Sequence, residues 1–349
     1  MSKRQITLSD LAKELGISTA TVSRALKDYP DISNKTKQRV LELAKKLNYR
    51  PNTMAAGLRK QESRIIGVII PEIVNHFFSS VIKGIMQVAY DSDYRVMICQ
   101  SDESYEKEVT DANALFNSRV DGLLVSLAHH TQSLDHFEEF INAGVPIVFF
   151  DKIPQHASMA ETSKVAVDDY QGAYQMVSHL ISQGAKRIAH FRGPMMAYTS
   201  RNRYNGYIQA HKDHGLELDE SLIFDTHNIT MEEGRQFANE VMQNPTGCDA
   251  IFCITDTVAI GAIDALKANG VKVPEDIMVA GFSDWQVSAI IDPPLSSVAQ
   301  PSLEMGKQAI ALLLHEINAQ KNNLTVEYQF IELPTELKIR QSSLRTKVV

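Results

Sequence analysis

The stretch TLSDLAKELGISTATVSRAL, Thr7 to Leu26, decides the fold of the first part of the chain. In its first half, apolar residues recur at helical spacing, and Gly16 follows them where a helix commonly ends in the left-handed conformation. Its second half carries short hydroxyl side chains and an arginine, with only Val22 and its neighbours left to pack inward. Ala12 is small enough for two short helices to cross closely beside the glycine turn. This pattern predicts a helix-turn-helix.

Three hydroxyl residues are expected to begin helices in this region. Thr7 stands three residues before Asp10, which is the spacing of a capping box, and Ser18 precedes the second helix. Ser33 precedes a third helix, whose inward positions are expected to be Val40, Leu43, Ala44 and Leu47. These signals predict a head of three short helices.

Charge divides the chain at about residue 64. Residues 1–64 hold 14 Lys and Arg against six Asp and Glu, which is a net charge of +8. The whole chain carries −7, so the remaining residues carry −15. A basic head on an acidic body is typical of a polyanion-binding module joined to a different domain.

The outward face of the second helix is expected to enter the major groove of DNA. Arg24 is the candidate for guanine recognition, since a guanidinium can donate to O6 and N7 together. Thr19 and Ala20 would add small polar and methyl contacts. Phosphate contacts are expected from Thr21, Ser23, Ser33, Asn34 and Thr36, and the other candidate DNA-binding residues are Thr7, Ser18, Tyr49 and Asn52. A small helical bundle that binds protein is the alternative interpretation.

The segment after the third helix is expected to be a hinge. Pro51 ends the preceding element, and Asn52 can cap a very short helix that runs through Leu58. So short a helix is marginal in water, and it is expected to form only when two copies pack together on DNA. Leu58 would then enter the minor groove as a wedge between base steps. A flexible linker is the alternative.

The rest of the chain has the rhythm of an α/β protein. Strand-like apolar runs such as IIGVIIP, DGLLVSL, VPIVFFD and AIFCITD alternate with amphipathic segments, which predicts parallel sheets buried on both faces. In open α/β sheets, ligands bind at the carboxyl edge of the strands. Asp151 directly follows one such run and is a candidate acceptor for paired ligand hydroxyls.

The chain resembles the lactose-repressor (LacI/GalR) family of bacterial transcription regulators from about residue 5 to residue 342. The resemblance rests on the order of the motifs TLSDLAKELGISTATVSRAL, NYRPNTMAAGL, IGVIIPEIVNHFF, RNRYNGY, TDTVAIGAIDAL and GFSDWQVSAIIDPPLSSVAQP. It implies an all-α helix-turn-helix head plus an α/β, two-lobed, periplasmic-binding-protein-like (type I) core with parallel sheets.

The expected organisation has three parts. Residues 1–50 form the DNA-binding domain, residues 51–63 the hinge, and residues 64–349 the effector-binding and dimerisation core. Within the core, the N-lobe is expected at about residues 64–163 and 295–325. The C-lobe is expected at about residues 164–294 and 326–342.

The resemblance also implies residues for an effector site. Arg203 in RNRYNGY matches the family arginine whose fork binds ligand oxygens, although an arginine that caps a surface helix is the alternative. Thr255 and Ser283 lie at family ligand positions but depart from the family pattern, which often has asparagine and aspartate there. The same matching adds Asn75, Phe77 and Gln300, with Phe77 either stacked on a sugar ring or part of the core.

The implied function is a homodimeric, cytoplasmic repressor. Its affinity for a near-palindromic double-stranded DNA operator would depend on a small-molecule effector, a sugar or sugar derivative. A periplasmic sugar-binding protein would share the core but would need a secretion signal, and an enzyme would need a nucleophile or acid–base pair, which no motif supplies. We expect no cofactor, no metal ligation at His129 and His130, no membrane partner, and reduced cysteines.

Overall fold

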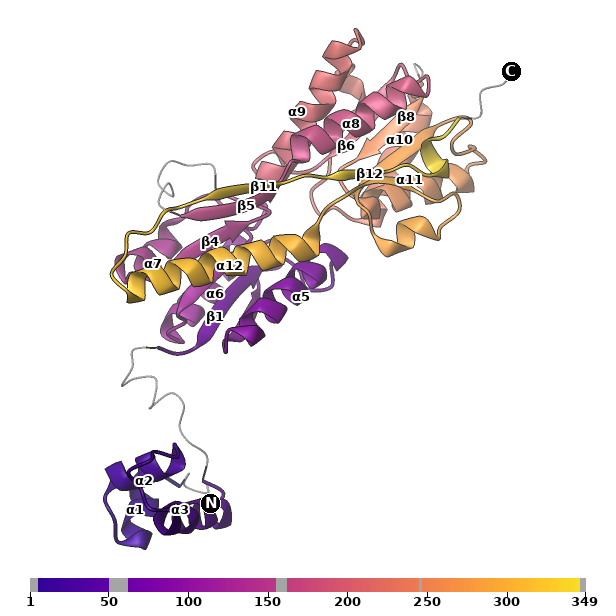
Figure 1. The fold of residues 1–349 in the computed structure, drawn as a ribbon. Coiled ribbons are helices and arrows are strands. Elements are labelled where there is room, and N and C mark those ends of the chain that lie inside the picture. Colours follow the sequence, from indigo (N-terminus) through magenta and orange to yellow (C-terminus); the bar gives the residue numbers. More distant parts are fainter. Residues whose placement is uncertain (1–5, 50–61, 155–161, 245–246, 346–349) are drawn as a thin grey trace. The chain divides into compact units, whose positions relative to one another are not determined.

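The computed structural model describes residues 6–49, 62–154, 162–244 and 247–345 and is shown in Figure 1. By its internal contacts the chain forms two compact units, Met1–Ser63 and Arg64–Val349. We call the first unit the head and the second unit the core.

The head contains three helices, α1 (Leu8–Leu15), α2 (Thr19–Leu26) and α3 (Asn34–Lys46). Its buried centre consists of Leu11, Ala12, Val22, Ala25, Val40 and Ala44. The expected caps are present, because the hydroxyls of Thr7, Ser18 and Ser33 each accept the backbone N–H three residues further on. Gly16 ends α1 at φ +67°, in the left-handed region that favours glycine. The head is a helix-turn-helix unit, as the sequence predicts.

The first sheet of the core is parallel throughout. Its strands lie in the order β11 (Phe330–Leu333), β5 (Ser163–Val167), β4 (Ile147–Phe150), β3 (Gly122–Val125), β1 (Ile65–Ile70) and β2 (Arg95–Gln100). The helices packed around it are α5 (His76–Asp91), α6 (Tyr105–Asn117), α7 (Glu138–Asn142) and α12 (Ser302–Lys321). In Figure 1, α12 runs along one face of this sheet beside α5.

Both faces of the first sheet are buried, which explains its continuous apolar runs. Alternate side chains of one strand point to opposite faces. Val68 and Val148 pack in the cluster that α5 and α12 complete, whereas Ile69 and Phe149 pack in the cluster that α6 and α7 complete. A strand placed between two layers of helices therefore needs apolar residues at every position.

The second sheet is parallel except at one edge. Its order is β12 (Glu336–Lys338), β10 (Ser296–Ala299), β9 (Met278–Ser283), β8 (Ala250–Cys253), β6 (Ile188–Arg192) and β7 (Ile223–Asp225), and β12 pairs with β10 in the antiparallel direction. Around it pack α8 (Asp169–Ser182), α9 (Tyr198–Asp213), α10 (Met231–Gln243) and α11 (Asp256–Ala268). Short 3₁₀ turns cover Asp135–Phe137, Glu220–Leu222, Gln286–Ala289 and Gln341–Ser343.

Strand pairing corrects the lobe boundaries expected from the sequence. β5 and β11 belong to the first sheet, whereas the sequence predicts residues 164–167 and 330–333 in the C-lobe. β10 belongs to the second sheet, whereas the sequence predicts residues 296–299 in the N-lobe. The physical reason is hydrogen bonding between strands: β5 pairs with β4 and β11, and β10 pairs with β9. The chain therefore passes between the sheets after β5, after β10 and after β11.

The described residues bear on two further points. Within them, no helix is both long enough and apolar enough to cross a membrane. Cys99, Cys248 and Cys253 are free thiols, and burial raises the pKa of each, that of Cys248 to about 11.

Candidate DNA-binding surface and effector site

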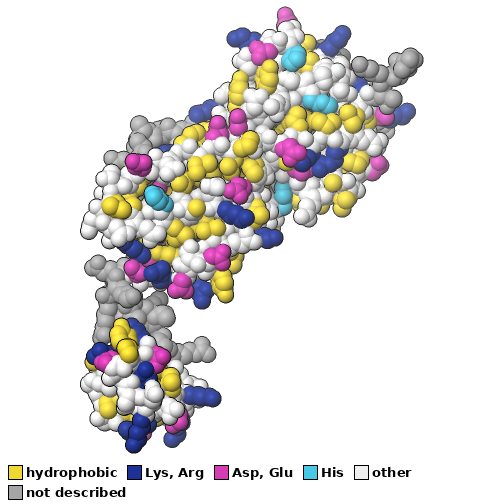
Figure 2. Space-filling view, viewed as in Figure 1, with side chains coloured by type: hydrophobic (Ala, Val, Ile, Leu, Met, Phe, Trp, Pro, Cys, Tyr) yellow, Lys and Arg dark blue, Asp and Glu magenta, His cyan; other side chains and the backbone are white. Residues whose placement is uncertain are grey.

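The outer face of α2 is polar and exposed. Ser18, Thr19, Ala20 and Arg24 are exposed, whereas Val22 and Ala25 are buried. The candidate residues Thr21 and Ser23 are half-buried beside this face. The hydroxyl-rich stretch thus leaves one face of the helix free for a polar partner and anchors the other face in the head. Figure 2 shows Lys and Arg side chains at several places on the visible surface of the head.

Paired hydroxyls stand at the N-termini of α2 and α3. The Oγ of Ser18 lies 2.8 Å from the Oγ1 of Thr21, and the Oγ of Ser33 lies 2.9 Å from the Oγ1 of Thr36. The N-terminus of a helix carries unpaired N–H groups and a partial positive charge, which suits phosphate. These four residues, with exposed Asn34, therefore have the chemistry that phosphate contacts require.

Two other DNA-binding candidates, Thr7 and Tyr49, have different surroundings. The hydroxyl of Thr7 donates to the carboxylate of Asp10 over 2.7 Å, so it acts within its own capping box. Tyr49 is half-buried against the centre of the head, and desolvation raises the pKa of its phenol. Asn52 and Leu58 lie outside the described residues.

Arg24 is held by two neighbours in the loop that follows α2. Its Nη2 lies 2.5 Å from Oδ2 of Asp31, and its guanidinium lies 5.5 Å from the centre of the Tyr29 ring. The Arg24 side chain remains 51% exposed. It can therefore reach a partner outside the head while one side of it is occupied.

Asp151 stands at the carboxyl end of β4, in the position that the sequence predicts. It is 5% exposed and adopts φ +58°, an unusual conformation for a residue other than glycine. The Oγ of Ser126, just after β3, donates to its Oδ2 over 3.4 Å. Burial raises the pKa of Asp151 to about 7, against the opposing effects of Lys152 and Arg203. A carboxyl group in this state favours hydrogen-bond donors as partners.

Arg203 is buried and already hydrogen-bonded. Its Nε donates to Oδ1 of Asp169 over 2.8 Å, its Nη1 donates to the carbonyl of Ile254 over 2.7 Å, and its guanidinium lies 3.7 Å from the Phe282 ring centre. The alternative of a surface arginine is therefore wrong, since Arg203 is only 5% exposed.

Asp169, at the start of α8, completes a charged group with these residues. Burial raises its pKa to about 6, although the Arg203 charge opposes this. Its Oδ2 is buried and accepts no hydrogen bond within the described residues. The charge of Asp169 raises the pKa of Asp151, and that of Arg203 lowers it, so the structure brings Asp151 and Arg203 into one electrostatic cluster.

A second charged group, which the sequence pattern does not indicate, lies beside Asp151. The Nζ of Lys152, which is 6% exposed, donates to Oε1 of Glu103, and the backbone N–H of His129 donates to Oε2 of Glu103 over 2.8 Å. Burial and the Lys152 charge hold the pKa of His129 well below its usual value. His129 has no acidic neighbour in sequence, but Glu103 is its acidic neighbour in space. Within the described residues, no group of three or more His, Cys, Asp or Glu could hold a metal.

Two predicted effector residues begin helix α5, and a third faces that helix from the second sheet. The Oδ1 of Asn75 accepts the N–H of Phe77 over 3.0 Å, and the Phe77 ring is buried edge-to-face against Phe78. Ser283 ends β9 at φ +108°, and its carbonyl accepts a hydrogen bond from Nε2 of His76 over 3.2 Å. The ends of the two sheets therefore meet here.

The last two predicted effector residues, Thr255 and Gln300, differ in their hydrogen bonding. The Oγ1 of Thr255 accepts the N–H of Val258 over 3.5 Å, at the start of α11. Gln300 directly follows β10, and its Nε2 is buried without a hydrogen-bond partner among the described residues. An unsatisfied amide at a strand end is a donor available to a ligand.

Two family models match this sequence. Residues 7–52 match bacterial regulatory proteins of the lacI family, and residues 63–336 match the periplasmic binding proteins and sugar-binding domain of the LacI family. The chain belongs to the LacI family. It is a DNA-binding transcriptional regulator with an effector-binding core, as members of the LacI family are.

Several known proteins align with nearly the whole chain. Catabolite control protein A from Priestia megaterium is 31% identical over 97% of this chain and 99% of its own length. The structure of the transcriptional regulator CelR with cellobiose is 27% identical, with a TM-score of 0.73, over 97% of this chain and all of that chain. The structure of the lac repressor dimer bound to operator and an anti-inducer is 25% identical, with a TM-score of 0.81, over 98% of this chain and all of that chain.

Proposed function

We propose that this regulator is a homodimeric repressor that binds a near-palindromic operator and responds to a sugar or sugar derivative. The observation that carries the proposal is the exposed polar face of α2, ending at Arg24, in the same chain as a buried charged cluster at the strand ends of the core. The head has the chemistry that DNA binding requires, and the core has the chemistry that effector binding requires. The relatives are transcriptional regulators, which favours regulation over catalysis.

On DNA, the exposed face of α2 would enter the major groove. Arg24 would recognise guanine, Thr19 and Ala20 would contact neighbouring base edges, and the paired hydroxyls would contact phosphate. Between the two heads, paired hinge helices would present Leu58 to the minor groove, as the sequence predicts. The effector would change operator affinity because it binds one arrangement of the two lobes more tightly than the other.

The core holds buried hydrogen-bonding groups of both kinds, among which Asp151, Asp169 and Arg203 interact electrostatically. Asp151 and the unpaired Oδ2 of Asp169 can accept from hydroxyls, while Arg203 and the unpaired Nε2 of Gln300 can donate to them. A polyol ligand offers both a donor and an acceptor at every hydroxyl. The cellobiose bound by the related regulator CelR is a ligand of this chemistry.

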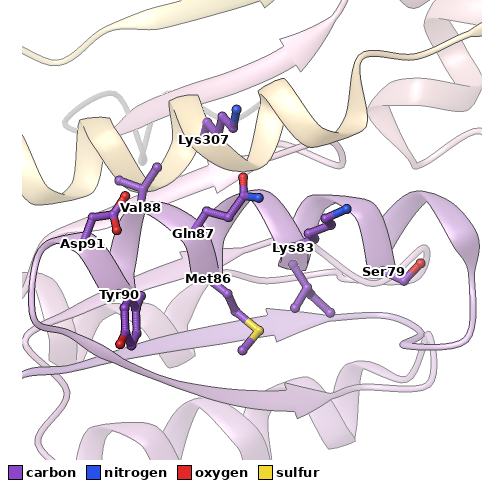
Figure 3. Close-up of a pocket in the computed structure, with 9 residues that line it drawn as sticks. Ser79, Lys83, Met86, Gln87, Val88, Tyr90, Asp91 and Lys307 are labelled. Carbon is purple, nitrogen blue, oxygen red and sulfur yellow. The ribbon is translucent and has the colours of Figure 1, made fainter.

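The outer side of α5 is the surface that we propose for dimerisation. A pocket lies along α5 toward Lys307 of α12, and Figure 3 shows Met86 and Tyr90 pointing from one side of α5. Met86 is 51% exposed and Tyr90 is 74% exposed, and Met97 on the edge strand β2 is 37% exposed. Exposed apolar side chains beside an open strand edge are typical of a protein interface. The related lac repressor structure is a dimer.

The double variant Met86→Arg/Tyr90→Arg is expected to raise the dimer dissociation constant at least about 10-fold, because it places two charges in an apolar interface. Analytical ultracentrifugation of the full chain measures this. Operator affinity should fall as well, since two linked heads bind more tightly than one. Leu324→Arg changes an apolar residue that is 63% exposed in the loop after α12 and serves as the matched control. Unchanged sedimentation of the double variant would place the dimer interface elsewhere.

The variant Arg24→Ala tests the DNA-binding half of the proposal. A preferred duplex is first selected from a randomised pool with the full-length protein. Arg24→Ala is then expected to lose about 10- to 100-fold of the preference at one base pair per half-site, which is the value of a bidentate guanine contact. Gel-shift titration against single-base variants of the duplex measures this loss.

Salt provides the control for that titration. Wild-type affinity should fall steeply and linearly in a double-logarithmic plot against salt concentration, because phosphate contacts release counterions. A flat salt response, or no duplex preferred over a scrambled competitor, would contradict DNA recognition by the head.

A further inference from the structure

The loop between α2 and α3 places an acidic and an aromatic side chain against Arg24. The carboxylate of Asp31 contacts Nη2 at 2.5 Å, and the Tyr29 ring lies 5.5 Å from the guanidinium carbon. Asp31 is 45% exposed on its side chain and Tyr29 is 46% exposed, so both stand on the surface that carries Arg24. An acidic group on a surface meant for DNA repels phosphate, which makes its presence there informative.

We propose that Asp31, together with Tyr29, is a specificity-determining pair that orients Arg24 for base recognition and opposes binding to non-cognate duplexes. The proposal rests on the function proposed above for Arg24. In this role neither residue needs to contact a base, because both act through Arg24. Asp31 and Tyr29 are thus positioning residues.

Two physical effects act in the same direction. An arginine side chain has many rotamers. The Asp31 carboxylate at one nitrogen of Arg24 and the Tyr29 ring beside its guanidinium restrict these rotamers before DNA binds. Arg24 therefore loses less side-chain entropy on binding. On a cognate duplex, the remaining donors of the Arg24 guanidinium can reach a guanine while the ion pair with Asp31 stays in place. On a non-cognate duplex, Arg24 gains no base contact, and Asp31 still repels the backbone. The pair therefore raises the ratio of cognate to non-cognate affinity more than it raises cognate affinity.

A second ion pair, between Asp28 of the same loop and Lys37 of α3, supplies a matched comparison. Lys37 Nζ lies 2.6 Å from Oδ1 of Asp28, whose side chain is 87% exposed and whose φ is +56°. Asp28→Asn removes one negative charge from the same loop, and asparagine tolerates positive φ. This variant changes the net charge as Asp31→Asn does, without touching Arg24. A general charge effect and a specific effect through Arg24 can therefore be separated.

The experiment compares full-length wild type, Asp31→Asn, Asp31→Glu, Tyr29→Leu and Asp28→Asn on the selected duplex and on all of its single-base variants. Asp31→Asn is expected to lower the preference about 3- to 10-fold at the base pair that Arg24→Ala identifies, and to leave the other positions unchanged. Tyr29→Leu should lower the same preference by a smaller factor, and Asp31→Glu should restore most of it. Asp28→Asn should strengthen binding to every duplex by a similar factor.

The double variant Arg24→Ala/Asp31→Asn tests whether Asp31 acts through Arg24. In that background, Asp31→Asn should leave base preference unchanged, because the group that it positions is gone. Equal preference of wild type and Asp31→Asn at every position would overturn the inference, as would equal losses in Asp31→Asn and Asp28→Asn. A wild-type protein with no preferred duplex would instead overturn the proposed function, so the two failures are distinct.

Discussion

Replacing Arg203 with alanine is expected to lower the free energy of unfolding of the core by about 3–5 kcal/mol, which is the usual cost of removing one partner of a buried ion pair. Arg203 and Asp169 are 5% and 1% exposed, and Nε of the arginine lies 2.8 Å from Oδ1 of the aspartate. Without Arg203, the Asp169 carboxylate stays buried without a counter-charge or takes up a proton. Urea unfolding followed by the fluorescence of Trp285, the single tryptophan of the chain, reports on the core alone.

The double variant Arg203→Ala/Asp169→Asn is the control, because it removes both charges and should recover most of the lost stability. It also allows a functional measurement in a folded protein. Sugars that shift the Trp285 fluorescence of wild type, tested from a panel that includes cellobiose, should no longer shift it in the double variant. Arg203→Ala with wild-type stability would contradict the buried pair, and an unchanged ligand response in the double variant would remove Arg203 from the effector site.

His190 is expected to contribute about 4–5 kcal/mol of destabilisation to the core as the pH falls from 6.5 to 3. It is fully buried in β6 and stacks on Tyr207 and Phe252, and its Nδ1 donates to the Phe252 carbonyl over 2.9 Å. Burial lowers the pKa of His190 from 6.5 to about 3. Its Nε2 has no partner among the described residues, so a second proton would be buried without an acceptor.

The sign follows from proton uptake. Below pH 6.5 the unfolded chain binds a proton at His190 while the native protein stays neutral there, so acid favours unfolding until the native histidine titrates near pH 3. Buried carboxyls act in the opposite direction, because burial raises the pKa of Asp151 and Glu316 to about 7 and that of Asp169 to about 6. The informative quantity is therefore the difference between variant and wild type at each pH.

His190→Asn retains a donor for the Phe252 carbonyl and cannot be protonated. Relative to wild type, it should gain about 2–3 kcal/mol between pH 7.5 and pH 4.5 in urea unfolding followed at Trp285. His214→Asn changes an exposed histidine at the end of α9 and should show no such gain. Parallel pH profiles for wild type and His190→Asn would show that His190 is not the buried neutral group described here.

The helix-turn-helix was predictable because its signals are local. Caps at Thr7, Ser18 and Ser33, the turn at Gly16 and apolar residues at helical spacing all act within a few residues along the chain. The buried strands were predictable for a similar reason, since strands covered on both faces need continuous apolar runs. The position of Asp151 at a strand end was predictable because this residue directly follows such a run.

Tertiary structure alone decided features that depend on residues distant in sequence. β10 lies in the second sheet and β11 in the first because of the strands with which they pair, and no local pattern specifies such pairing. The ion pair of Asp169 with Arg203 spans 34 positions and that of Glu103 with Lys152 spans 49, so neither has a spacing signal. In the head, the sequence predicts that Arg24 recognises a base, but only the fold showed that Asp31 and Tyr29 lie against Arg24. Local periodicity determines which elements form, whereas packing between them determines which side chains share a site.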